Sequence, residues 1–257
     1  MSAAVVVTSG VVGLAVGSFV GVVADRLPSK ESIVSPPSRC VACGVAIHAY
    51  DKIPVVSYLV LRGRCRSCGA RIPPRDALTE IVTALLFVAV ALRVPSPWIL
   101  PAYAVLAASM VAVTAIDLEH LRIPTRLIYG TALVGAPLLV LASAGTHRWS
   151  ALITAAVGAA AAFAAFFALF TAVPKGIGFG DVRLAGLCGG FLGWVGYREV
   201  AAGVLLGFVL AGIPAVVLLL LHRVNRRTQF PFGPFLAGST MITVLWGPTL
   251  VHAWSQM

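Results

Sequence analysis

Four cysteines in a polar stretch have the spacing of a metal site. They form two Cys-x-x-Cys pairs, Cys40 with Cys43 and Cys65 with Cys68. Each pair is followed by a glycine, Gly44 or Gly69, as expected where the backbone turns tightly beneath an ion. Four thiolates suit tetrahedral Zn²⁺ and leave no open position for catalysis, so we predict a structural zinc site. The alternatives are two disulfides, which a reducing compartment disfavours, or a redox pair.

Two aspartates beside apolar segments form a second candidate site. Asp117 ends one apolar segment, and Asp181 follows the closely spaced glycines Gly178 and Gly180. Ionisable groups at membrane depth are costly and usually functional. Two carboxyls that share one proton could activate a water, because one removes its proton while the other polarises a carbonyl. Alternatively, Asp117 begins a loop and Asp181 caps a short helix that starts at Val182.

Long apolar segments must position these residues. The chain is 59% hydrophobic and 11% charged, with a mean hydropathy of +0.96, which excludes an ordinary soluble domain. A membrane-spanning helix needs about 20 apolar residues, and six segments approach that length. With two shorter ones, the predicted segments are 1–24, 77–92, 94–116, 127–146, 149–174, 184–197, 200–221 and 228–251. We therefore predict an all-α polytopic membrane protein with about eight transmembrane helices.

Small residues within these segments predict where helices pack. Gly13, Gly17 and Gly21 recur every four residues in the first segment, and glycines are frequent between residues 186 and 196. Small residues let transmembrane helices approach closely, so we expect both sets to lie at helix interfaces. Cys188 lies alone in the second set, and we expect a buried, inert thiol there.

The distribution of charge predicts the orientation. The chain has 19 Lys and Arg against 9 Asp and Glu, a net charge of +10. With eight spans and both termini outside, all the basic residues except Arg93, Arg148 and Arg198 fall on one side. The positive-inside rule makes that side cytoplasmic, and it also carries the cysteine loop and both aspartates. Because topology explains the positive charge, we predict no nucleic-acid partner.

Taken together, these features resemble the type IV prepilin peptidases, which are membrane aspartyl proteases of the GxGD type. The matching pieces, in order, are Gly17-Ser18-Phe19, the cysteines Cys40, Cys43, Cys65 and Cys68, Glu80, Asp117 with Ile123-Pro124, Gly178-Phe179-Gly180-Asp181, and Pro231-Phe232-Gly233-Pro234. Three features depart from the family pattern. Gly21 stands where many members have Asn, Arg183 stands where Lys is usual, and residues 75–79 before Glu80 lack the Tyr-Pro that is often found there.

The resemblance implies a cytoplasmic-side endopeptidase in a prokaryotic cell membrane. It would remove the short basic leader of type IV prepilin-like precursors, with Asp117 and Asp181 as catalytic residues. Members with the four-cysteine loop commonly also methylate the new N-terminal residue, with S-adenosylmethionine as methyl donor. The chain would then divide into a first helix at 1–24, a zinc-binding, methyltransferase-associated loop at 25–76, and a peptidase bundle at 77–257. Its partners would be the precursors and membrane lipid.

Two other functions stay open at this point. One is a membrane transporter or assembly scaffold, in which the zinc-stabilised loop docks a partner and the aspartates bind an ion. The other is a methyltransferase without peptidase activity. The sequence motifs assign no residues to S-adenosylmethionine and no oligomeric state.

Overall fold

The computed structural model describes residues 1–173, 177–221 and 231–254, and over these ranges the chain is helical. The described part contains no β-strand, only two isolated bridges between residues 39 and 46 and between 64 and 71. Two compact units divide the chain, Met1–Leu92 and Arg93–Met257. The all-α fold predicted from the apolar segments is therefore confirmed.

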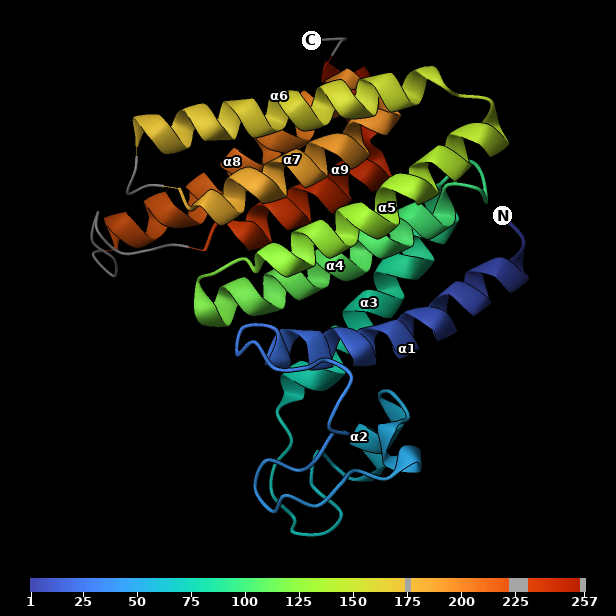
Figure 1. The fold of residues 1–257 in the computed structure, drawn as a ribbon, viewed down its shortest axis with the longest axis vertical. Helices are drawn as coiled ribbons and strands as arrows, with labels where there is room; N and C mark the ends of the chain where they lie inside the picture. The colour runs from blue at the N-terminus through green and yellow to red at the C-terminus, as the bar shows by residue number, and fades with distance from the viewer. Residues whose placement is uncertain (174–176, 222–230, 255–257) are drawn as a thin grey trace. The chain divides into compact units, whose positions relative to one another are not determined.

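The N-terminal unit consists of two long helices and the loop that joins them. Its helices are α1 (Ala3–Arg26), the 3₁₀ helix η1 (Ala49–Lys52), the short α2 (Val56–Val60) and α3 (Pro74–Arg93). The loop, residues 27–73, carries the four cysteines and contains little regular structure (Figure 1). We call this loop the cysteine module.

Helices α1 and α3 approach each other through the glycines of α1. A Cβ atom at Gly13 would lie 2.7 Å from the Cα of Ala84, and one at Gly17 would lie 2.6 Å from the Cα of Glu80. Any side chain at these two positions would push the backbones apart. The packing role predicted for Gly13 and Gly17 is confirmed, since transmembrane helices associate where small residues permit such contact.

The C-terminal unit is a bundle of long helices (Figure 1). They are α4 (Leu100–His120), α5 (Thr125–Thr146), α6 (Ser150–Ala172), α7 (Phe179–Val195), α8 (Tyr197–Leu220) and α9 (Gly233–Trp254). Helix α7 packs against α5, α6, α8 and α9, which makes it the central helix of the bundle. Its cysteine, Cys188, is 2% exposed, as expected for an inert buried thiol.

Glycines also set the contact between α6 and α7. A Cβ atom at Gly189 would lie 2.4 Å from the carbonyl oxygen of Gly158, and one at Gly193 would lie 2.5 Å from the carbonyl oxygen of Thr154. The two backbones therefore touch directly. This contact fixes α7, and with it the residues at its first turn.

Each of the eight predicted segments coincides with a long helix, and some bounds differ. Helix α4 runs past residue 116 to His120, because Leu121 ends it in a left-handed conformation with φ of 49°. Within the described ranges, five helices are long and apolar enough to span a membrane: α1, α4, α5, α6 and residues Tyr197–Val217 of α8. Predicted residues 174 and 228–230 lie outside the described ranges. The number of spans stays a prediction.

Candidate functional site

The four cysteine sulfurs of the N-terminal unit gather at one point. The Sγ atoms of Cys40, Cys43, Cys65 and Cys68 all lie within 4.8 Å of one another. Those of Cys40 and Cys68 are 3.8 Å apart, which is about the edge of a tetrahedron of sulfurs bound at about 2.3 Å to a central ion. All four are free thiols, so the disulfide alternative is wrong. The cluster could hold a metal ion.

The two cysteine pairs have the same local backbone. The N–H of Gly44 donates to the carbonyl of Cys40 at 2.8 Å, and the N–H of Gly69 donates to the carbonyl of Cys65 at 2.9 Å. Both glycines are left-handed, with φ of 71° and 70°. This conformation favours glycine, so the tight turns predicted after each pair are confirmed.

Backbone amides favour the thiolate form at the first pair. Hydrogen bonds from the backbone of Cys43 and Ala42 lower the pKa of the Cys40 thiol to about 6. Thiolate is the form that binds a metal ion. The turn around Cys40 therefore favours the thiolate, which is the form that would bind an ion.

An ion pair links η1 to the second cysteine pair. The Nε and Nη2 atoms of Arg66 donate to the carboxylate of Asp51 at 2.9 and 2.7 Å, and the guanidinium also lies 5.3 Å from the centre of the Tyr50 ring. The hydrogen bond from Arg66 lowers the pKa of Asp51, so this carboxylate is ionised at neutral pH. The pair joins the two halves of the cysteine module.

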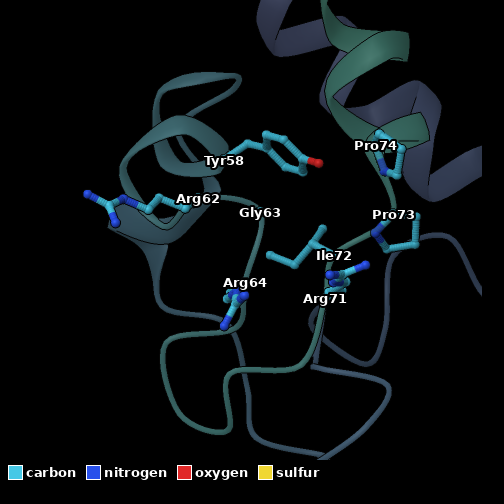
Figure 2. Close-up of a pocket in the computed structure, with 8 residues that line it drawn as sticks. All are labelled: Tyr58, Arg62, Gly63, Arg64, Arg71, Ile72, Pro73 and Pro74. Atoms are coloured by element: carbon cyan, nitrogen blue, oxygen red, sulfur yellow. The ribbon is translucent and has the colours of Figure 1, made fainter.

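A basic pocket of about 570 Å³ lies on the cysteine module where α3 begins (Figure 2). It is lined by Tyr58, Arg62, Gly63, Arg64, Arg71, Ile72, Pro73 and Pro74. None of its three arginines makes an ion pair with another described residue. The pocket therefore concentrates positive charge of the kind that the positive-inside rule places on the cytoplasmic side.

A larger cavity, of about 900 Å³, also lies within the N-terminal unit. The last turns of α1, the cysteine module and the first turns of α3 form its walls. Its lining includes apolar side chains such as Phe19 and Ile53 together with four carboxylates, Asp25, Asp51, Asp76 and Glu80. This size and mixed lining are typical of sites for small organic ligands.

In the C-terminal unit, Asp117 lies inside the last turn of α4. Its side chain is buried, and its Oδ2 accepts a hydrogen bond from the backbone N–H of Gly233 at 3.0 Å. Gly233 is the first residue of α9, so the contact joins two helices that are distant in sequence. The alternative that Asp117 merely begins a loop is wrong.

Asp181 lies in the first turn of α7. Its Oδ2 accepts the backbone N–H of Gly178 at 3.0 Å, so the side chain does cap a helix, although this helix begins at Phe179 and not at Val182. Nearby, Arg183 donates to the hydroxyl of Thr125 at 2.6 Å. The cap uses one carboxylate oxygen and leaves the other for further interactions.

The structure brings the two aspartates to the same end of the bundle. A Cβ atom at Gly180 would lie 3.0 Å from the Cβ of Ile123, and one at Gly233 would lie 3.3 Å from its Cδ1. Ile123 thus separates the glycine next to Asp181 from the glycine that binds Asp117. The carboxyl of Asp117 also interacts electrostatically with that of Asp181.

Gly233 is a residue of the site to which the sequence motifs assigned no role. The signal was its place in the Pro231–Pro234 motif, where a glycine between bulky residues indicates a close backbone approach. The preceding residue, Phe232, packs its ring against Phe166 and Phe208, with centroids 5.8 and 5.3 Å apart. These contacts anchor the segment that presents the Gly233 amide to Asp117.

Comparison with known proteins identifies the class. The model of the bacterial peptidase A24 N-terminal domain matches residues 11–94, and that of the type IV leader peptidase family matches residues 104–220. The chain is therefore an enzyme of the membrane peptidase class. It belongs to the type IV leader peptidase family. The two matches meet near the boundary between the two structural units.

Curated relatives cover nearly the whole chain. A prepilin leader peptidase/N-methyltransferase of Pseudomonas aeruginosa is 31% identical, over 95% of this chain and 91% of the relative. The protein of the same name from Aeromonas hydrophila is 33% identical, over 93% and 90%. That of Myxococcus xanthus is 36% identical, over 85% and 65%. No solved structure matches the chain.

Proposed function

We propose that this enzyme removes the leader of type IV prepilin-like precursors at the cytoplasmic face of a prokaryotic membrane, with Asp117 and Asp181 as its catalytic pair. The observation that supports this most is the position of both aspartates at one end of the C-terminal unit, where Ile123 lies beside both Gly180, the neighbour of Asp181, and Gly233, which binds Asp117. The names of the relatives indicate the substrate class. No comparison supports the transporter or scaffold alternative.

The proposed chemistry is general acid and base catalysis by the two carboxyls. The ionised one removes a proton from a water molecule, which attacks the scissile carbonyl, while the protonated one donates to the carbonyl oxygen. Each Oδ2 is oriented by one backbone amide, from Gly233 or Gly178. The remaining oxygens, Oδ1 of Asp117 and Oδ1 of Asp181, are then available to the water and to the substrate.

The test is cleavage of a prepilin by the purified enzyme in detergent, with product masses read by mass spectrometry. We expect Asp117→Asn and Asp181→Asn each to lower the cleavage rate by about 10³-fold or more, because the amide of Asn cannot take up or release a proton as a carboxyl does. Glu119→Gln, an exposed acid two residues from Asp117, is the matched control and should cleave normally. Full cleavage by either aspartate variant would exclude the proposed pair.

We further propose that the cysteine cluster holds a structural Zn²⁺ and that the enzyme methylates the new N-terminus with S-adenosylmethionine. The gathering of four sulfurs within 4.8 Å of one another, two of them at 3.8 Å, supports zinc. A four-sulfur site is closed, so the ion would stabilise the cysteine module and take no part in a reaction. The methyltransferase part of the relatives' names supports the second activity, for which S-adenosylmethionine would supply the methyl group.

A further inference from the structure

The N-terminal unit contains a cavity that the peptidase reaction does not use. Its volume of about 900 Å³ is at the upper end of the range for sites that enclose drug-sized ligands. The two aspartates lie in the other structural unit and contribute nothing to its lining. A second ligand of the enzyme would therefore have room here.

Glu80 is the carboxylate of this cavity that is best prepared for a ligand. Its Oε2 accepts the backbone N–H of Val55 at 2.7 Å, and its Oε1 makes no hydrogen bond or ion pair with another described residue. By contrast, Asp25 pairs with Arg75 and Asp51 pairs with Arg66. One oxygen of Glu80 is thus free to accept from a hydroxyl or to face a cation.

The backbone beside Glu80 is strained. Val55 has φ of 60° and ψ of −45°, a conformation that β-branched residues rarely adopt. Such strain persists only where surrounding contacts enforce it, and it is concentrated at functional sites. Here the hydrogen bond to Glu80 is one of those contacts, so the wall of the cavity is held in a defined shape.

The other groups of the lining complement a zwitterionic nucleoside. Phe19 and Ile53 provide apolar surface for a base, and a carboxylate such as Glu80 can bind ribose hydroxyls. Lys52 and Arg71 line the same cavity and can pair with the carboxylate of an amino acid. S-adenosylmethionine carries all of these parts.

We propose that this cavity, bounded by α1, the cysteine module and the start of α3, is the S-adenosylmethionine site of the enzyme, with Glu80 as a binding residue. The assignment rests on the proposed methylation. It also gives the cysteine module a function, because a metal that orders the module would shape one wall of the site. Cys40 and Cys65 are themselves part of the lining.

Gly21 provides a way to fill the cavity without disturbing the helix contact. It lines the cavity, and a Cβ atom there would meet only the Thr79 hydroxyl, at 3.6 Å. A Phe side chain at this position has space to project inward. Gly130 of α5 is the matched control, since it is exposed and no atom lies within 4 Å of its added Cβ.

The experiment measures binding of S-adenosylmethionine to the full-length, zinc-loaded enzyme by isothermal titration calorimetry. We expect Gly21→Phe to abolish detectable binding and Glu80→Gln to weaken it at least about tenfold, because Gln keeps an acceptor for Val55 but loses the charge. Gly130→Phe should bind like the wild type. Zinc content and thermal unfolding verify that each variant is folded. A photoreactive 8-azido analogue should label peptides from residues 1–92.

The outcomes separate this inference from the proposed function. If the wild type binds and methylates but Gly21→Phe and Glu80→Gln bind equally well, the cavity is not the site and the methylation stands. Labelling confined to residues 93–257 would lead to the same conclusion. If the wild type cleaves prepilin but neither binds nor methylates, both the methylation and this site are wrong.

Discussion

At the scale of single residues, the site depends on a glycine as much as on its acids. Gly233 donates its N–H to Asp117, and a Cβ atom there would lie 2.7 Å from the Oδ2 that accepts this bond. Glycine is therefore required by close approach, in the same way as at Gly17 of α1, where a Cβ would meet the backbone of Glu80. Neither position needs glycine for an unusual φ.

We predict that Gly233→Ala lowers kcat for prepilin cleavage by about 10²-fold with little change in KM, because the methyl group displaces the Asp117 carboxyl from its reactive position. Steady-state kinetics in detergent measures both constants. Gly238→Ala in the same helix, where no atom lies within 4 Å of the added Cβ, should retain the wild-type kcat. An unchanged kcat in Gly233→Ala would show that the amide contact does not position Asp117.

At the scale of elements, the cysteine module contrasts with the helices on either side of it. Its regular structure amounts to η1, with four residues, and α2, with five. So short a segment cannot bury enough apolar surface to be stable alone, and a metal ion commonly supplies the missing stability. The Asp51–Arg66 pair adds a second link, but an ion pair whose arginine is half exposed contributes little by itself.

We predict that the enzyme keeps one zinc ion at pH 7.5 and loses it in acid, because protons compete with the ion for the four thiolates. Dialysis at stepped pH followed by elemental analysis measures the zinc content. Cys40→Ser should lose the ion at pH 7.5, whereas Cys188→Ser, altered in the buried thiol of α7, should keep it.

Full zinc in Cys40→Ser at pH 7.5 would contradict the four-thiolate site. The temperature of thermal unfolding should depend on whether zinc is bound. Removal of zinc with a chelator at pH 7.5 is expected to lower the first unfolding transition, because ion binding and folding of the module are coupled.

At the scale of the whole molecule, charge distinguishes the two ends of the C-terminal unit. Arg122 lies between α4 and α5 and Arg126 lies in the first turn of α5, at the end that carries both aspartates. At the opposite end, Arg148 lies over the ring of Trp194 and Arg198 lies in the first turn of α8. From the positive-inside rule, applied to the full chain, we predict that the aspartate end lies in the cytoplasm.

We predict that an impermeant maleimide labels His147→Cys in intact cells, because this exposed residue lies between α5 and α6 at the opposite end. Glu119→Cys should be labelled only after the membrane is permeabilised. The wild type, whose exposed cysteines lie in the cysteine module that we predict to be cytoplasmic, is the control and should remain unlabelled in intact cells. The reverse pattern for the two variants would invert the proposed orientation.

The all-α fold, the position of each long helix, the cysteine quartet and the family could all be predicted from the sequence alone. These are local properties: the length of an apolar segment and the spacing of cysteines in two tight turns are complete within a short stretch of chain. The cap formed by Asp181 is equally local, since its partner Gly178 lies three residues away.

Contacts between residues that are distant in sequence became visible only in the folded structure. The hydrogen bond from Gly233 to Asp117 spans 116 positions, and the wall between α1 and α3 depends on backbone contact at Gly17. The cavity with Glu80 likewise exists only when both helices and the cysteine module are assembled. Such contacts follow from the packing of whole helix surfaces, which depends on many side chains at once and has no signature at any single position.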